Sequence, residues 1–139
     1  MVNFDQQSDV QEGSVFKTRV TELLGIRHPV VCGGMTNVGR AGLAAAVSNA
    51  GGLGMITALT TGSPIKLEQE IAATRELTDK PFAINLTILP TINPIPFDEY
   101  ADVIANSGVA AVETAGRNPE QYISKFKAGG LICIHKAVS

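Results

Sequence analysis

The sequence predicts an α/β fold with a parallel sheet, and two features of its 139 residues indicate this. Segments with helical spacing alternate with short apolar runs along most of the chain, which is the order that a parallel sheet with connecting helices requires. The apolar runs are nearly continuous and do not alternate with polar residues, as expected for parallel strands covered on both faces. The chain length favours one domain with a substantial core.

The expected elements follow one another in strict alternation after a first short helix. In chain order they are a helix within 17–26, a strand within 28–34, a helix within 39–51, a strand within 52–57, a helix over 63–77, a strand within 80–86, a helix over 97–108, a strand within 109–115, a helix within 118–129 and a strand within 130–136. Ser63 as N-cap and Pro64 at the first helical position begin one helix, and Gly25 and Gly108 are typical helix stops.

The stretch AAAVSNAGGLGM, residues 44–55, joins the second expected helix to the following strand. Its alanines allow close packing on the sheet, and its glycines end the helix and turn the chain directly into the strand. This junction lies at the end of the sheet opposite the carboxyl ends of the strands. We therefore expect it to be scaffold and no part of a ligand site.

Composition excludes several classes of function. The formal net charge is −2 with acids and bases interspersed, which disfavours binding to nucleic acid or to an anionic membrane surface. No apolar run approaches the roughly 18 residues of a membrane span, and residues 1–16 lack a secretory signal and are expected to be a flexible arm. The scattered Cys32 and Cys133 indicate a reducing, cytoplasmic location. Together with His28 and His135 they lack the short spacing of metal ligands, so we expect no metal site.

Polar residues and glycines gather where the expected strands end, which is where parallel α/β folds bind ligands. Gly33 and Gly34 allow a ligand to approach the backbone or form an ordinary turn. Asn85 either hydrogen-bonds a ligand or caps a loop, and Glu113 is either a hydrogen-bond acceptor or half of a structural ion pair. Lys136 either offers positive charge to a ligand or is solvated. Because strand side chains alternate, only one of His135 and Lys136 points inward.

Two architectures fit this order of elements, an open doubly wound sheet and a (β/α)8 barrel. A barrel needs eight strands and roughly 250 residues. The four βα units and fifth strand would then be about half of one. The first and fifth strands would be unpaired edges, which open the chain to self-association.

The segment LLGIRHPVVCGGMTNVGRAGLAAAVSNAGGLGMITALT resembles the N-terminal signature of the nitronate monooxygenase family, also called 2-nitropropane dioxygenases. LTDKPFAINLTILPTINP, GVAAVETAG and HKAVS continue the resemblance to Ser139. It implies the N-terminal half of a (β/α)8 barrel that binds FMN, spanning 17–139, in an enzyme that oxidises alkyl nitronates with O2 to carbonyl compounds and nitrite. It also implies that Gly33, Gly34 and Met35 contact the isoalloxazine ring, that Asn85 hydrogen-bonds the flavin, and that Lys136 faces it.

The chain departs from the family pattern at two places. Gly34 stands where members commonly have proline. The family's catalytic histidine has no counterpart before Ser139, and neither His28 nor His135 is at its position, so the catalytic residue is unknown and the chain alone is expected to be inactive. The alternatives are a flavin-dependent enoyl-acyl-carrier-protein reductase, which shares the SNAGGLG block, and a non-catalytic half-barrel.

Overall fold

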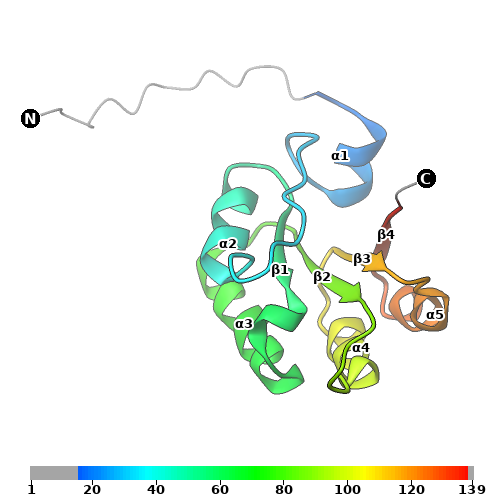
Figure 1. Cartoon of the computed structure of the whole chain (residues 1–139). Helices are drawn as coiled ribbons and strands as arrows, with labels where there is room; N and C mark the ends of the chain where they lie inside the picture. Colours follow the sequence, from blue (N-terminus) through cyan, green and yellow to red (C-terminus); the bar gives the residue numbers. More distant parts are fainter. Residues whose placement is uncertain (1–15, 138–139) are drawn as a thin grey trace, which may run out of the picture.

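The computed structural model describes residues 16–137 and shows a parallel sheet with connecting helices (Figure 1). The helices are α1 (Arg19–Leu24), α2 (Ala41–Asn49), α3 (Pro64–Leu77), α4 (Phe97–Asn106) and α5 (Glu120–Ala128), with a 3-10 helix η1 (Ala58–Thr61). The strands are β1 (Gly54–Thr57), β2 (Phe82–Ile88), β3 (Ala111–Gly116) and β4 (Ile132–Lys136), all parallel and in the order β1-β2-β3-β4. The predicted fold class is confirmed. The arm predicted over 1–16 lies, except for Phe16, outside the described residues.

The strand expected within 28–34 is the one element that the structure corrects. It is reduced to a single bridge between Val31 and Leu53, with the Cys32 N–H donating to the carbonyl of Leu53 at 3.0 Å. The segment runs beside β1 as expected but pairs on one side only, and Val31 is 41% exposed. Pro29 has no N–H to donate to a ladder. A regular strand therefore does not form here.

Helix ends follow the signals in the sequence. Ser63 accepts a hydrogen bond from the Lys66 N–H at 3.3 Å and begins α3, with Pro64 in the first helical turn. Gly25 ends α1 in the left-handed conformation, at φ 66°. These positions confirm that capping residues set the boundaries of these helices.

The two faces of the sheet have different partners. Helices α2 to α5 cover one face, and Figure 1 shows α1 apart from them. We call the face opposite α2–α5 the inner face. Near the start of the strands it is apolar and packs on α1 and the residues after it, through a cluster of Leu24, Ile26, Leu53, Met55, Ala83 and Ala111. The core on the helix-covered face is larger and includes Ile56, Ile84, Leu86, Ile104, Val112 and Phe126.

The glycines of residues 44–55 are packing positions, in agreement with their prediction as scaffold. A Cβ on Gly54 would lie 1.8 Å from the carbonyl oxygen of Ala44, so α2 rests directly on the start of β1. Gly51 has φ +92° and faces the side chains of Arg27 and His28.

None of the helices within residues 16–137 has the length and apolar character that a membrane span needs.

Candidate functional site

The polar residues predicted at the strand ends meet on the inner face, at the carboxyl end of the sheet. We call this group the mouth; it consists of Gly34, Met35, Thr57, Asn85, Glu113 and Lys136. Its centre is the carboxylate of Glu113, whose side chain is 3% exposed. Oε2 accepts from the Gly34 N–H at 3.3 Å, and Oε1 accepts from Asn85 Nδ2 at 3.2 Å and lies 2.6 Å from Lys136 Nζ.

The register of the parallel strands brings these side chains together. Asn85 is the direct partner of Glu113, and Glu113 is the direct partner of Ile134. Lys136 lies two residues beyond Ile134 and therefore on the same face. The sequence prediction that Asn85 and Lys136 share one site is thus consistent with the register.

The loop before α2 sits on the end of β1. The Thr57 hydroxyl accepts from the Met35 N–H at 2.8 Å and donates to the Met35 carbonyl at 3.0 Å. A Cβ on Gly39 would lie 2.2 Å from Thr57 Oγ1, so this approach needs a glycine. The backbone of Met35 is held on both sides, while its side chain is 40% exposed at the rim.

Gly34 lies against Asn85 with no room for a side chain. A Cβ at Gly34 would be 2.2 Å from Asn85 Cγ, and Asn85 itself is 1% exposed. The neighbouring Gly33 is less constrained, since its Cβ would come to 3.3 Å from Glu113 Oε2. A residue with a Cβ at position 34 would collide with the Asn85 side chain in the position that it has here.

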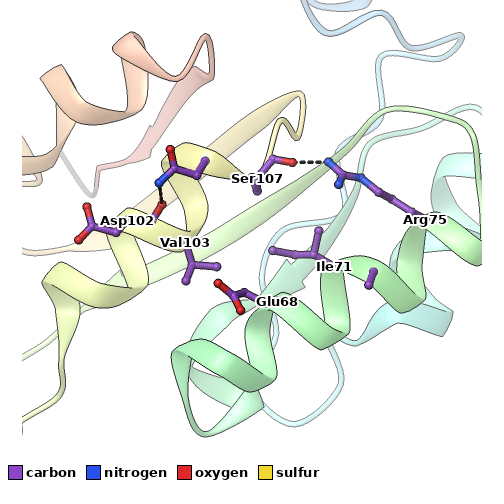
Figure 2. A pocket seen from close by; sticks show the side chains of 8 residues that line it. Glu68, Ile71, Arg75, Asp102, Val103 and Ser107 are labelled. Carbon is purple, nitrogen blue, oxygen red and sulfur yellow. Dashed lines mark hydrogen bonds between the residues drawn. The ribbon is translucent and has the colours of Figure 1, made fainter.

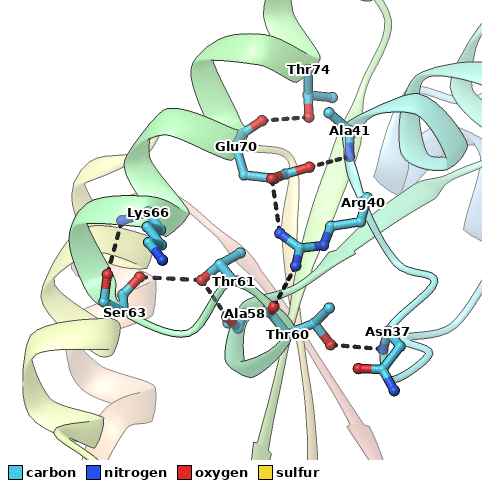
Figure 3. A network of polar contacts seen from close by, with 10 residues as sticks. All are labelled: Asn37, Arg40, Ala41, Ala58, Thr60, Thr61, Ser63, Lys66, Glu70 and Thr74. Carbon is cyan, nitrogen blue, oxygen red and sulfur yellow. Dashed lines mark hydrogen bonds and ion pairs between the residues drawn. The ribbon is translucent and has the colours of Figure 1, made fainter.

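A second polar network holds the loop from the helix side (Figure 3). Glu70 of α3 accepts from the Ala41 N–H at 2.7 Å and from Arg40 at 3.2 Å. Arg40 donates to the carbonyl of Thr60 at 2.7 Å, and the Thr60 hydroxyl accepts from the Asn37 N–H at 3.1 Å. Helix α2 has no cap from its own Arg40, so a carboxylate from α3 supplies the cap.

The two histidines of the sequence lie away from the mouth. His135 projects from the face opposite Lys136, with its Nδ1 2.9 Å from the Thr114 hydroxyl, as the alternation along a strand predicts. His28 lies beside Gly51 at the other end of the sheet, and its backbone N–H donates to the Gly51 carbonyl at 2.8 Å. Neither imidazole reaches the mouth.

The cysteines do not pair, and the described residues hold no group of three or more His, Cys, Asp or Glu side chains placed to bind a metal. Cys133 lies on the helix-covered face of β4 and packs against its core. Burial raises the pKa of the Cys133 thiol, partly offset by the positive charge of Lys127. A raised pKa leaves less of the reactive thiolate at Cys133 than at a free cysteine at the same pH.

A groove lies between α3 and α4 on the helix side of the sheet (Figure 2). It has a volume of about 310 Å³ and is lined by Glu68, Ile71, Ala72, Arg75, Asp102, Val103, Asn106 and Ser107. Arg75 crosses it to donate to the carbonyl of Ser107. None of the predicted site residues lines this groove, so it is separate from the mouth.

Two residues of the mouth were not among the predicted site residues. Glu113 was left open between a hydrogen-bond acceptor and a structural ion pair, and the structure shows both in one carboxylate. The signal for it is a carboxylate inside an apolar run, in register with Asn85. Thr57 carries no comparable signal, because threonine at a strand end is ordinary.

Comparison with known proteins agrees with the resemblance found in the sequence. The family model described as nitronate monooxygenase matches residues 17–137. Over 68 residues, 49% of the chain and 19% of the relative, the chain is 52% identical to nitronate monooxygenase of Pseudomonas aeruginosa. Over 121 residues, 87% of the chain and 33% of the relative, it is 36% identical to (3aS,4S,5R,7aS)-5-hydroxy-7a-methyl-1-oxo-octahydro-1H-indene-4-carboxyl-CoA dehydrogenase of Rhodococcus jostii.

A solved structure gives the same fold. FabK from Thermotoga maritima, a TIM-barrel enzyme, superposes with a TM-score of 0.76 at 39% sequence identity, over 86% of this chain and 37% of that one. The chain spans about a third of the length of the relatives that it matches most fully, so the parallel sheet described here corresponds to part of a barrel. The match over 17–137 and the similarity of fold show that the chain belongs to the nitronate monooxygenase family.

Proposed function

We propose that this chain is part of an FMN-dependent oxidoreductase of nitronate monooxygenase type, which oxidises alkyl nitronates with O2 to carbonyl compounds and nitrite. The observation that carries the proposal is the mouth, where polar groups from three segments gather around the Glu113 carboxylate at the carboxyl ends of parallel strands. Ligands of barrel enzymes bind at this end. Membership of the family supports the reaction type.

The residues of the mouth fit a flavin by their chemistry. The isoalloxazine ring is flat and has carbonyl oxygens and ring nitrogens that accept hydrogen bonds. Gly33 and Gly34 let the loop pack closely on Asn85 and Glu113, which places its backbone at the carboxyl end of the sheet, where a flat ring would bind. Asn85 and Lys136 supply donors, and Met35 supplies an exposed apolar side chain at the rim. We therefore assign cofactor binding to these five residues.

Bound FMN would supply the electron acceptor and the oxygen chemistry that the reaction needs. The chain's own residues bind and orient: Lys136 places a positive charge beside an anionic ring or nitronate, and Asn85 fixes a hydrogen-bonding edge. None of the described histidines is placed to move a proton at the mouth. We propose, from the family resemblance, that the catalytic histidine lies beyond Ser139.

We further propose that 17–139 is one half of the barrel and is inactive by itself. At the edge strand β4, Ile132, Cys133 and Ile134 are only partly buried, which is how an unpaired strand of a larger sheet looks. The same edge opens the chain to self-association. The free thiols of Cys32 and Cys133 are compatible with a cytoplasmic location.

The proposal is tested by the purified chain and by a chimera. The chain alone should be colourless after purification and show no nitronate-dependent O2 uptake; a soluble, flavin-loaded monomer would contradict this expectation. In the chimera, residues 17–137 replace the corresponding segment of the Pseudomonas aeruginosa nitronate monooxygenase. It should retain FMN and consume O2 with an alkyl nitronate, and Asn85→Ala in it should weaken FMN retention. A folded chimera without flavin would refute the proposal.

A second candidate is a flavin-dependent enoyl-acyl-carrier-protein reductase, whose substrate is an acyl thioester. The relative that aligns over 87% of the chain is named as a carboxyl-CoA dehydrogenase, which favours thioester chemistry for part of the family. The same chimera separates the two, since flavin reduction by a nicotinamide followed by oxidation with an enoyl thioester would favour the reductase. A non-catalytic half-barrel would bind no flavin in either setting.

A further inference from the structure

We propose that Glu113 is the positioning residue of the mouth. Its buried carboxylate fixes the Gly34 N–H, the Asn85 side-chain amide and the Lys136 ammonium group in position relative to one another. This inference rests on the proposed flavin site and deepens it, because it names the residue that orients the groups that would face the ring. Glu113 itself is not assigned a contact with flavin or substrate.

The burial of Glu113 is the first support. Its side chain is 3% exposed, while that of Lys136 is 52% exposed. An ion pair with an exposed lysine contributes little to stability, and a strand end in water would provide it without burying the carboxylate. Burying a carboxylate is costly unless several donors satisfy it. A simple strand-end ion pair therefore does not explain the position of Glu113, whereas three converging donors do.

The second support is that Glu113 is the shared hydrogen-bond or ion-pair partner of three groups that come from different segments of the chain. Gly34 comes from the loop before α2, Asn85 from β2 and Lys136 from the end of β4. Among the described residues, no hydrogen bond or ion pair joins Lys136 to Gly34 or to Asn85; each reaches the Glu113 carboxylate. Moving that carboxylate must therefore change the positions of all three groups together.

The third support comes from the surroundings of the mouth. Gly34 packs on Asn85 without room for a Cβ, and Thr57 holds both backbone groups of Met35. The loop is thus fixed from the β1 side by neutral hydrogen bonds, and from the β3 side by one charged acceptor. Thr57 contributes two neutral hydrogen bonds to the loop and Glu113 contributes one bond to a charged acceptor, so both sides are needed to hold the loop in place.

The first measurement uses the ligand-free chain and ¹H–¹⁵N NMR spectra. It follows the backbone amide resonance of Gly34 and the side-chain amide resonance of Asn85, which are the groups that donate to Glu113. Glu113→Gln keeps the shape but replaces one acceptor oxygen by an NH2 group facing other donors, so both resonances should move. Glu76→Gln removes the same charge from an exposed position on α3 and should leave them in place. Unchanged resonances in folded Glu113→Gln would overturn the proposal.

A second variant covers the case in which Glu113→Gln does not fold. Lys136→Gln alters a half-exposed side chain that touches neither Gly34 nor Asn85 by any described hydrogen bond. It should nevertheless shift both amide resonances. Without Lys136 the Glu113 carboxylate can move, and the hydrogen bonds that it accepts from Gly34 and Asn85 change with it. If they stay where they are in the wild-type chain, the shared carboxylate does not couple the three groups and the proposal fails.

The third measurement tests flavin binding in the chimera described above, with FMN and riboflavin as probes and quenching of flavin fluorescence as the signal. Glu113→Gln should raise the Kd by about tenfold, because Asn85 and Lys136 are no longer held in the positions in which they would face the ring. Glu76→Gln should leave it unchanged. Equal affinities of the unsubstituted and Glu113→Gln chimeras would overturn the proposal. If the chimera with Glu113 in place binds neither probe, the cofactor role proposed for this chain fails, and the NMR result alone decides on Glu113.

Discussion

Replacing Gly34 with alanine tests the contact between the loop and β2. The new Cβ would lie 2.2 Å from Asn85 Cγ and 2.6 Å from Asn85 Oδ1, well inside the roughly 3.5 Å at which carbon atoms pack. Asn85 is 1% exposed and donates to Glu113, so it has no empty space to enter. Either the loop or the Asn85 side chain must move.

Both ways of relieving the clash have a comparable cost. A shift of the loop is overpacking, which destabilises proteins by about 1–3 kcal/mol. Rotation of Asn85 away from Gly34 breaks its hydrogen bond to the Glu113 carboxylate, and such bonds to charged groups contribute about 1.5–3 kcal/mol. We therefore expect Gly34→Ala to lower the free energy of unfolding by about 1–3 kcal/mol.

Urea unfolding followed by far-UV circular dichroism measures this difference, with Gly42→Ala as the matched control. Gly42 lies in α2, is exposed, and has no heavy atom within 4 Å of the position of a Cβ. Alanine there should stabilise the helix by about 0.5–1 kcal/mol. If Gly34→Ala is as stable as the wild-type chain, the loop does not rest on Asn85 and the geometry of the mouth is wrong.

Three further variants test the scaffold and the thiol. Gly54→Ala should abolish folding, because its Cβ would lie 1.8 Å from the backbone oxygen of Ala44; a native circular dichroism spectrum would contradict this. Glu70→Ala should lower the free energy of unfolding by about 1–2 kcal/mol, because its carboxylate caps the first N–H of α2, and unchanged urea unfolding would show that the cap is dispensable. In a Cys32→Ser background, Cys133 should react with iodoacetamide more slowly than a free thiol near pH 8, since burial raises its pKa and only thiolate reacts. Its rate, followed by mass spectrometry, should climb as the pH is raised through that pKa; a rate equal to that of glutathione would refute the shift.

Much of the fold can be read from local signals. Ser63 and Gly25 bound helices because capping is a matter of a few neighbouring residues, and those residues are adjacent in sequence. The expected strand within 28–34 is wrong because apolar composition does not by itself determine the hydrogen bonds of a strand. Pro29 has no N–H to donate, and the segment forms one bridge, between Val31 and Leu53.

The site is less accessible to sequence reasoning because it depends on register. That Asn85 and Lys136 end strands is visible in the sequence, but their distance from each other follows from which residues pair across β2, β3 and β4. Glu113 is central only because it stands opposite Asn85, so its role was left open between two ordinary ones. The reciprocal hydrogen bonds between Thr57 and Met35 join residues that the α2 helix separates, and no local pattern announces them.

On each of the four strands, the side chains of the inner face change from apolar to polar within two residues. Apolar Met55, Ala83, Ala111 and Ile134 are each followed two residues later by Thr57, Asn85, Glu113 and Lys136. The apolar part is covered near the start of the strands by Leu24 and Ile26, and the polar residues lie at the other end. Substitutions on either side of that boundary should therefore separate into those that affect folding and those that affect binding. A change at Asn85 or Lys136 should therefore alter ligand binding more than stability, whereas a change at Met55 or Ala83 should do the reverse.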